Sequence, residues 1–203
     1  MTPDVFFYGP SLGAFGAACA ARKAFGSDTD YLPFEAPVAL SEVAGKHVII
    51  AGVSPVRAVV ESMLRTCRSV LVIEHGREVS SDWGFLSEAD TTWTEYVEGS
   101  LRPDHYSHNG AALFSRDTSV ASMGWSFFHS GITEPALFRY LNWYELGVDK
   151  PSVVDTMTAV ASYERDFITW EFLSERFETS QGFWEFVLEG RAILRQRDID
   201  RAP

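Results

Sequence analysis

The stretch that decides the fold is HVIIAGVSPVRAVVESMLRTCRSVLVI, residues 47–73. Its two ends, residues 47–51 and 69–73, are short apolar runs rich in β-branched residues and without polar alternation. Such runs are typical of strands buried on both faces of a parallel sheet. Residues 55–66 between them have the composition of a helix with proline in its first turn. A strand, a helix and a strand at this spacing predict a right-handed βαβ unit.

The residues before this unit show the same alternation. Val5–Tyr8 is an apolar run that ends at Gly9-Pro10, and the alanine-rich residues 13–25 favour a helix. Residues 31–34 are a weaker strand candidate, because Pro33 suits a sheet edge or the end of a strand. We therefore expect an α/β fold, with a parallel sheet and flanking helices over residues 1–80.

The sequence after residue 80 is expected to be mainly helical, and residues 1–203 to form one domain. Residues 79–110 hold Trp83, Trp93 and many acids and give no clear pattern. An aromatic stripe is expected in the core rather than as a platform for stacking bases: Phe167, Trp170, Phe177, Trp184 and Phe186. Five later segments have apolar residues near helical spacing: 119–128, 134–145, 151–161, 167–177 and 181–197.

The composition is that of an acidic globular protein. Hydrophobic residues make up 46% of the 203, charged residues 22%, and the formal net charge is -11. This charge disfavours long nucleic acids as partners but not a small nucleotide. The apolar runs are shorter than the roughly 20 residues of a membrane span, and the start lacks the positive end of a signal peptide. Cys19 and Cys67 have no metal or redox spacing, so we expect a reduced, cytoplasmic protein without a membrane partner.

Three loops are expected to meet at one edge of the sheet, because open parallel sheets bind ligands at the carboxyl ends of their strands. Residues 9–13 and 52–54 offer glycine amides, hydroxyls and helix N-termini, which suit an anion such as phosphate. Residues 74–77 add a histidine and an arginine, both donors. The candidate ligand-binding residues are Ser11, Gly13, Ser54, His75, Gly76 and Arg77.

Two catalytic or cofactor patterns overlap the first loop. Gly9-x-Ser11-x-Gly13 matches the nucleophile elbow of serine hydrolases, but the spacing identifies no partner histidine or acid. Gly9, Gly13 and Gly16, followed by Glu35, imitate a dinucleotide fingerprint with the wrong glycine spacing. The glycines also have a plain structural explanation, since they allow tight turns between strand and helix.

A metal site is a further alternative. Glu74 and His75 could be joined by His105 and His108, which lie in an expected loop. Histidine pairs in loops are more often simply solvated.

Nearly the whole chain resembles the DHH-family phosphoesterases, which are two-manganese hydrolases of nucleotides and oligonucleotides. Residues 7–26 resemble the family's first motif with its alanine-rich helix, and residues 45–50 resemble the strand of the second motif. Residues 69–77 stand where the family carries Asp-His-His. Residues 119–129 and 162–170 resemble a later helix and a segment of the branch of oligoribonucleases and cyclic-nucleotide phosphodiesterases. The resemblance implies an α/β domain, manganese in active relatives, and a smaller C-terminal domain that grips substrate.

Most metal ligands of this family are missing at the matching positions. Its first motif, His-x-Asp-x-Asp-Gly, is replaced by Gly-Pro-Ser-Leu-Gly-Ala at residues 9–14, and Gly52 stands where the second motif has aspartate. Glu74 and His75 keep the kind of ligand found in the third motif, whereas its second histidine is replaced by Gly76. We also expect no C-terminal substrate domain of the kind that the resemblance implies, since the last expected helix ends near Arg197.

A two-metal hydrolase must hold cations about 3.5–4 Å apart with hard ligands. We therefore expect a catalytically inactive DHH-like protein, without a resident metal or cofactor, that binds a small phosphorylated ligand (a nucleotide or cyclic nucleotide) as a sensor or sequestering protein. One alternative is a scaffold that self-associates or binds a protein through the acidic residues 82–101. Another is a residual metal-dependent phosphodiesterase that uses Glu74, His75 and Glu145, the last in place of the fourth motif's aspartate.

Overall fold

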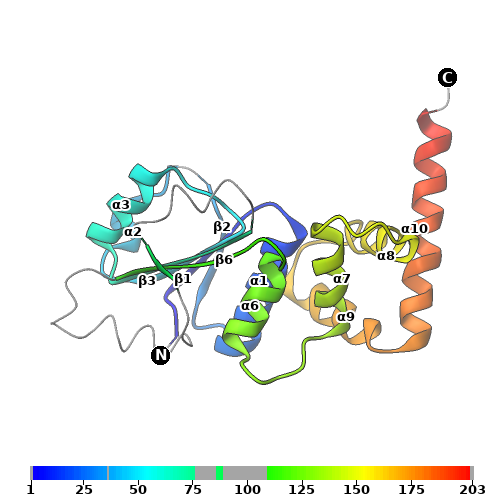
Figure 1. Ribbon diagram of the computed structural model, residues 1–203, viewed down its shortest axis with the longest axis horizontal. Coiled ribbons are helices and arrows are strands. Elements are labelled where there is room, and N and C mark those ends of the chain that lie inside the picture. Colours follow the sequence, from blue (N-terminus) through cyan, green and yellow to red (C-terminus); the bar gives the residue numbers. More distant parts are fainter. Residues whose placement is uncertain (1, 36, 76–85, 89–108, 202–203) are drawn as a thin grey trace. The chain divides into compact units, whose positions relative to one another are not determined.

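The computed structural model describes residues 2–35, 37–75, 86–88 and 109–201 (Figure 1). The chain packs as two compact units, Met1–Ile132 and Thr133–Pro203, which are described separately. The sequence predicts one domain whose helical part starts near residue 81, whereas the structure groups residues up to 132 with the sheet. Among the described helices, none combines the length and the hydrophobicity that a bilayer-spanning segment requires.

The first unit is built on a sheet in which every pair of neighbouring strands in the described residues is parallel. The strand order is β2-β1-β3-β4-β6-β5. In the register, Val5 pairs with Val48, and Val70 pairs with Gly110. The predicted α/β class with a parallel sheet is confirmed. The strands are β1 (Val5–Tyr8), β2 (Asp30–Pro33), β3 (His47–Ala51), β4 (Ser69–His75), β5 (Ser87–Glu88) and β6 (Gly110–Ser115).

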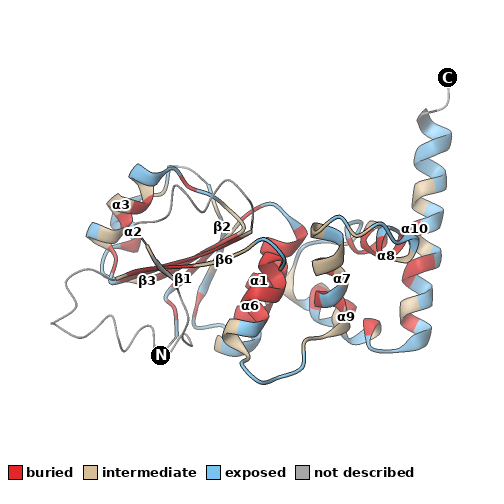
Figure 2. Cartoon of the chain, viewed as in Figure 1, coloured by how far each residue is buried: buried red, intermediate tan, exposed pale blue. Residues whose placement is uncertain are grey.

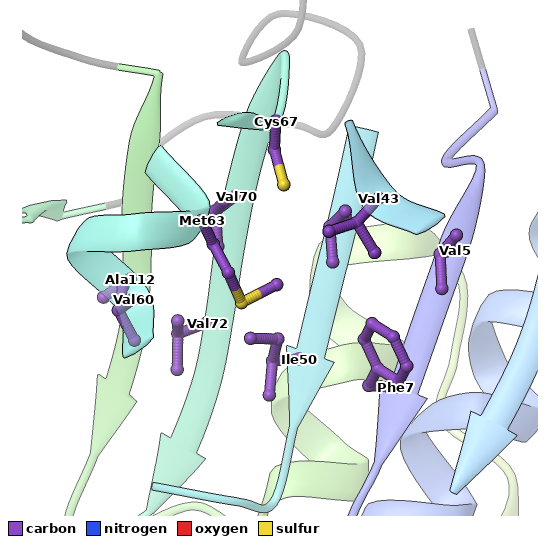
Figure 3. Packing of buried hydrophobic residues seen from close by; sticks show 11 residues of the cluster. Val5, Phe7, Val43, Ile50, Val60, Met63, Cys67, Val70, Val72 and Ala112 are labelled. Carbon is purple, nitrogen blue, oxygen red and sulfur yellow. The ribbon is translucent and has the colours of Figure 1, made fainter. Parts of the chain in front are cut away.

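Helices cover both faces of this sheet. Because successive residues of a strand point to opposite faces, the central strands direct apolar side chains toward both layers of helices. One face packs on α2 (Leu40–Val43) and α3 (Arg57–Thr66), as Figure 3 shows for Met63 and its neighbours. The other face carries Phe6, whose ring contacts Phe128 of α6 at 6.2 Å between centroids. Helices α1 (Leu12–Phe25) and α6 (Val120–Phe128) pack against each other on that face. The central strands are thus buried on both faces, as their unalternating apolar sequences predict.

The cluster against α2 and α3 excludes water almost completely. Val60 and Met63 of α3 have no exposed surface, and Cys67, which follows α3, is 6% exposed. Burial raises the pKa of the Cys67 thiol to about 11. Each fully buried aliphatic side chain of this kind stabilises the fold by about 1.5–3 kcal/mol. The cluster consists of Val5, Phe7, Val43, Val48, Ile50, Val60, Met63, Cys67, Val70, Val72 and Ala112.

Among the differences from the sequence prediction, three concern α3, β4 and β6. Helix α3 begins at Arg57 after the N-cap Val56, so Pro55 precedes the helix instead of lying in its first turn. Strand β4 continues to His75, so Glu74 and His75 belong to a strand rather than to a loop. Strand β6 was not predicted, because its sequence GAALFS lacks β-branched residues.

The second unit is helical, as predicted. Asp166 caps the start of α9 by accepting a hydrogen bond from the Thr169 amide at 2.9 Å. Helix α8 crosses α10 so closely that a Cβ on Gly190 would lie 1.7 Å from the Asp155 carbonyl oxygen. Beside this crossing, the Arg191 guanidinium pairs with the Asp155 carboxylate at 2.8 Å. The helices are α7 (Ala136–Glu145), α8 (Pro151–Val160), α9 (Phe167–Phe177) and α10 (Ser180–Arg201).

The aromatic stripe expected in the core is only partly buried. Trp170, Phe177 and Phe186 are 2%, 3% and 0% exposed, which agrees with a core role. Trp184 of α10 is 58% exposed, and Figure 2 shows that much of this helix is exposed. The prediction that Trp184 belongs to the core is therefore wrong.

Candidate functional site

The carboxyl edge of the sheet contains a topological switch point between β1 and β3. Tyr8 of β1 contacts Phe15 of α1 at 5.3 Å between ring centroids, so α1, which follows β1, packs on the face of the sheet that carries Phe6 and Tyr8. Strand β3 leads to α3, which packs on the opposite face with Phe7 and Ile50. The connections that follow these two neighbouring strands therefore run to opposite faces of the sheet. Open α/β sheets bind ligands at this position.

The loops after β1 and β3 approach each other backbone to backbone at the switch point. The Gly9 amide donates to the Ala51 carbonyl at 2.9 Å. A Cβ on Gly9 would lie 2.1 Å from the Gly52 carbonyl oxygen. Gly52 has φ +65°, and a Cβ there would lie 2.4 Å from the Ala14 Cβ. Neither glycine can carry a side chain unless the backbone shifts.

The start of α1 lies next to this contact. Ser11 is exposed and is the N-cap residue, since its Oγ accepts a hydrogen bond from the Ala14 amide at 3.0 Å. Gly13 is buried in the first turn of the helix. The cap accounts for Ser11 structurally. It also fixes the N-terminus of a 14-residue helix, with its partial positive charge, at the carboxyl edge of the sheet.

Ser54, Glu74 and His75 are brought together at the ends of β3 and β4. Glu74 is 8% exposed, and one of its carboxylate oxygens accepts from the Ser54 hydroxyl at 3.3 Å. The other accepts from the His75 amide at 2.8 Å. The His75 Nδ1 atom is buried and has no hydrogen-bond partner in the described part of the chain. A buried polar atom of this kind is a candidate contact for a ligand.

Glu35, the acid that follows the fingerprint-like glycines, also lies at this edge of the sheet. Glu35 is exposed and follows β2 by two residues. Strand β2 is the neighbour of β1, and the Phe34 amide donates to the Tyr8 carbonyl at 2.8 Å. The strands therefore place Glu35 and the loop after β1 at the same edge of the sheet.

Several predicted residues lie outside this assembly. Gly76, Arg77, His105, His108 and most of residues 82–101 are outside the described residues. Glu145 is the last residue of α7 in the second unit. Within residues 2–35, 37–75, 86–88 and 109–201, no group of three or more His, Cys, Asp or Glu residues is placed to hold a metal ion.

Two further histidines have structural contacts. His47 is 3% exposed at the opposite edge of the sheet, with Nδ1 2.7 Å from the Ser69 hydroxyl. Burial lowers its pKa. The Nε2 atom of His129 lies 2.9 Å from the Ala20 carbonyl oxygen and links α6 to α1. Neither belongs to the carboxyl edge of the sheet.

Comparisons with protein-family models, with curated proteins and with solved structures found no match for this chain. The case for function therefore depends on the geometry of the carboxyl edge and on the resemblance carried by the sequence.

Proposed function

We propose that this chain binds a small nucleotide at the carboxyl edge of its sheet and does not hydrolyse it. The observation that carries the proposal is the coincidence of the switch point between β1 and β3 with the N-terminus of α1. In open parallel sheets these two features together form the place where nucleotide phosphates bind.

The phosphate end of the ligand would lie at the start of α1. The aligned peptide dipoles of a helix place about half a positive charge at its N-terminus. Ser11 is exposed there, and its hydroxyl hydrogen can be donated while its oxygen accepts from Ala14. This local attraction acts at short range, so it can hold a small anion despite the net charge of -11.

The ribose end would lie toward β2. The exposed Glu35 carboxylate can accept hydrogen bonds from ribose hydroxyls. This role requires no conserved glycine fingerprint, only an acid beyond the strand next to β1. It favours ribonucleotides over inorganic phosphate as the ligand class.

The absence of hydrolysis follows from what stands at the positions that resemble DHH-family metal ligands. Ser11 and Gly13 stand at the positions of the first motif's aspartates. Gly9 and Gly52 pack so closely that a Cβ on Gly9 would lie 2.1 Å from the Gly52 carbonyl oxygen. Two divalent cations need several hard ligands held at fixed separation. These residues do not fit a pair of manganese ions, so we propose a DHH-like scaffold that binds without turnover.

Isothermal titration of the full chain with AMP, ADP, ATP and cyclic AMP tests the proposal. We expect at least one of them to bind, and Ser11→Asp to weaken it at least about tenfold through charge repulsion at the helix start. Ser11→Asn is the matched control, since Asn and Asp both cap helices well but only Asp is charged. No binding by folded wild-type protein, or equal binding by the two variants, would contradict the proposal.

The ribose contact has its own test. Glu35→Gln should weaken binding of the ribonucleotide about three- to tenfold and leave the 2′-deoxy form nearly unchanged, because a charged acceptor is lost. Incubation of the bound nucleotide with the protein and Mn²⁺ should give no product. Turnover that disappears in His75→Ala would instead support the metal-dependent phosphodiesterase.

A further inference from the structure

Helices α1 and α6 begin next to each other at the carboxyl edge of the sheet (Figure 1). A Cβ on Gly124 of α6 would lie 3.1 Å from the Ala17 Cβ, and farther along the Phe128 ring contacts Phe25 at 5.3 Å between centroids. These contacts advance along both helices in the same direction, so the helices run parallel. Ala17 is the sixth residue of α1 and Gly124 the fifth of α6, so the two N-termini lie at nearly the same level. Two partial positive charges therefore lie side by side at this edge.

Arg116 supplies a full positive charge before the start of α6. It is exposed and directly follows β6, and three residues later Ser119 caps α6 by accepting from the Ser122 amide at 3.3 Å. Asp117 is also exposed, and its amide donates to the Ser115 hydroxyl at 3.1 Å. The turn thus contains one base and one acid, and the amides at the start of α6 favour an anion there.

His75, at the end of β4, points to the face of the sheet that α1 and α6 cover. Val70 and Val72 of β4 belong to the cluster on the α3 face, so His75 lies on the other face by alternation. Glu74, its acidic neighbour, points to the α3 face. The register sets His75 beside Ser115, and its Nδ1 atom is buried without a hydrogen-bond partner among residues 2–35, 37–75, 86–88 and 109–201. Such an atom costs free energy that a hydrogen-bonding ligand can recover.

The strand order sets these groups in a row. From β2 to β6, the carboxyl edge carries in turn Glu35, Ser11, the loop after β3, His75 and Arg116. Neighbouring strands are about 4.8 Å apart, so the ends of β1 and β6 are separated by about 14 Å. In the function proposed above, the ribose lies toward β2 and the first phosphate at α1. Further phosphates of the same ligand would therefore extend toward β4 and β6.

We propose that the ligand is a nucleoside triphosphate, whose terminal phosphates bind between His75, Arg116 and the N-terminus of α6. This inference rests on the proposed function, because that function fixes the direction in which the phosphates extend. A monophosphate held at α1 ends before these groups and gains nothing from them. A triphosphate gains hydrogen bonds from the Arg116 guanidinium and the His75 imidazole to charged oxygens, which are stronger than bonds between neutral groups.

Isothermal titration of the full chain with ATP and with AMP, in buffer without divalent cations, tests the proposal. We expect ATP to bind at least about tenfold more tightly than AMP, because hydrogen bonds to charged groups contribute most. Arg116→Gln should weaken ATP binding at least about fivefold and change AMP binding less than about twofold. Arg68→Gln is the matched control and should change neither, because Arg68 is equally exposed but precedes β4 at the opposite edge of the sheet.

The His75 contact is tested by two further variants. His75→Ala should weaken ATP binding at least about threefold, and His75→Asn should weaken it less, since the Asn amide places a donor near the position of the Nδ1 atom. Equal ATP binding by the wild type and His75→Ala would overturn the proposal. So would AMP that binds as tightly as ATP, or equal effects of Arg116→Gln and Arg68→Gln; in each of these cases the proposed function still stands. If none of AMP, ADP, ATP and cyclic AMP binds the folded chain, both fail.

Discussion

Placing a methyl group on Gly52 tests the closed packing at the switch point. Gly52 has φ +65°, a conformation that costs a non-glycine residue about 1–2 kcal/mol. Its new Cβ would also lie 2.4 Å from the Ala14 Cβ, and overpacking of this kind costs about 1–3 kcal/mol more. We therefore expect Gly52→Ala to lower the free energy of unfolding by about 2–5 kcal/mol.

Gly45 supplies the matched control for the backbone contribution. It has φ +71°, and a Cβ there would meet nothing within 4 Å. Gly45→Ala should therefore lower the free energy of unfolding by only about 1–2 kcal/mol. The difference between the two variants measures the steric contact alone.

Urea unfolding followed by far-UV circular dichroism provides the measurement. Adding Ala14→Gly to Gly52→Ala removes one of the two clashing methyl groups. The double variant should be at least about 1 kcal/mol more stable than the sum of the single effects predicts. Equal losses for Gly52→Ala and Gly45→Ala, or strict additivity with Ala14→Gly, would refute the packing argument. The result also bears on function, because Gly52→Asp, which would place a carboxylate at this position, would meet the same obstacle.

Three further predictions concern ionisable groups. Burial lowers the pKa of His47, so the unfolded chain takes up that proton first and the free energy of unfolding should fall as the pH drops below about 6.5. Urea titrations of the wild type and of His47→Gln at several pH values check this, and equal slopes of the free energy of unfolding against pH would contradict it. Arg191→Ala leaves the buried Asp155 carboxylate without its partner and should cost about 1–3 kcal/mol in the same assay, whereas Arg57→Ala breaks an exposed pair and should cost under about 1 kcal/mol. The thiol of Cys67, with its pKa raised to about 11 by burial, should resist iodoacetamide at pH 8 until urea unfolds the chain, as mass spectrometry of the labelled peptide would show.

The central strands could be predicted because a strand buried on both faces of a sheet needs apolar residues at nearly every position. The runs at Val5–Tyr8 and His47–Ala51 are apolar at every position or nearly so, and both form strands with these bounds. Helix α9 matches residues 167–177 because Asp166 provides a recognisable cap and the following apolar residues keep helical spacing. Local signals of this kind need no knowledge of the rest of the chain.

Other elements depend on tertiary context. Residues Gly110–Ser115 form strand β6 because β4 provides backbone hydrogen-bonding partners, with Val70 opposite Gly110, and not because of the β-propensity of their own sequence. At the candidate site, the sequence gives the edge of the sheet and the residues on it. It does not reveal that Gly9 meets the Gly52 carbonyl, since that contact joins two loops about 40 residues apart. The pairing of Ser54 with Glu74 is hidden for the same reason.

The order of the strands has a consequence for biosynthesis. Strand β1 leaves the ribosome first, yet it pairs on both sides with strands made later: Val5 lies opposite Asp30 and Val48. Strand β4 in turn pairs with β6, in which Gly110 lies opposite Val70. A nascent chain that stops before residue 110 would expose one whole side of β4, an apolar edge of the kind that recruits other chains. Slow translation just upstream of β6 should therefore make the growing polypeptide depend on chaperones.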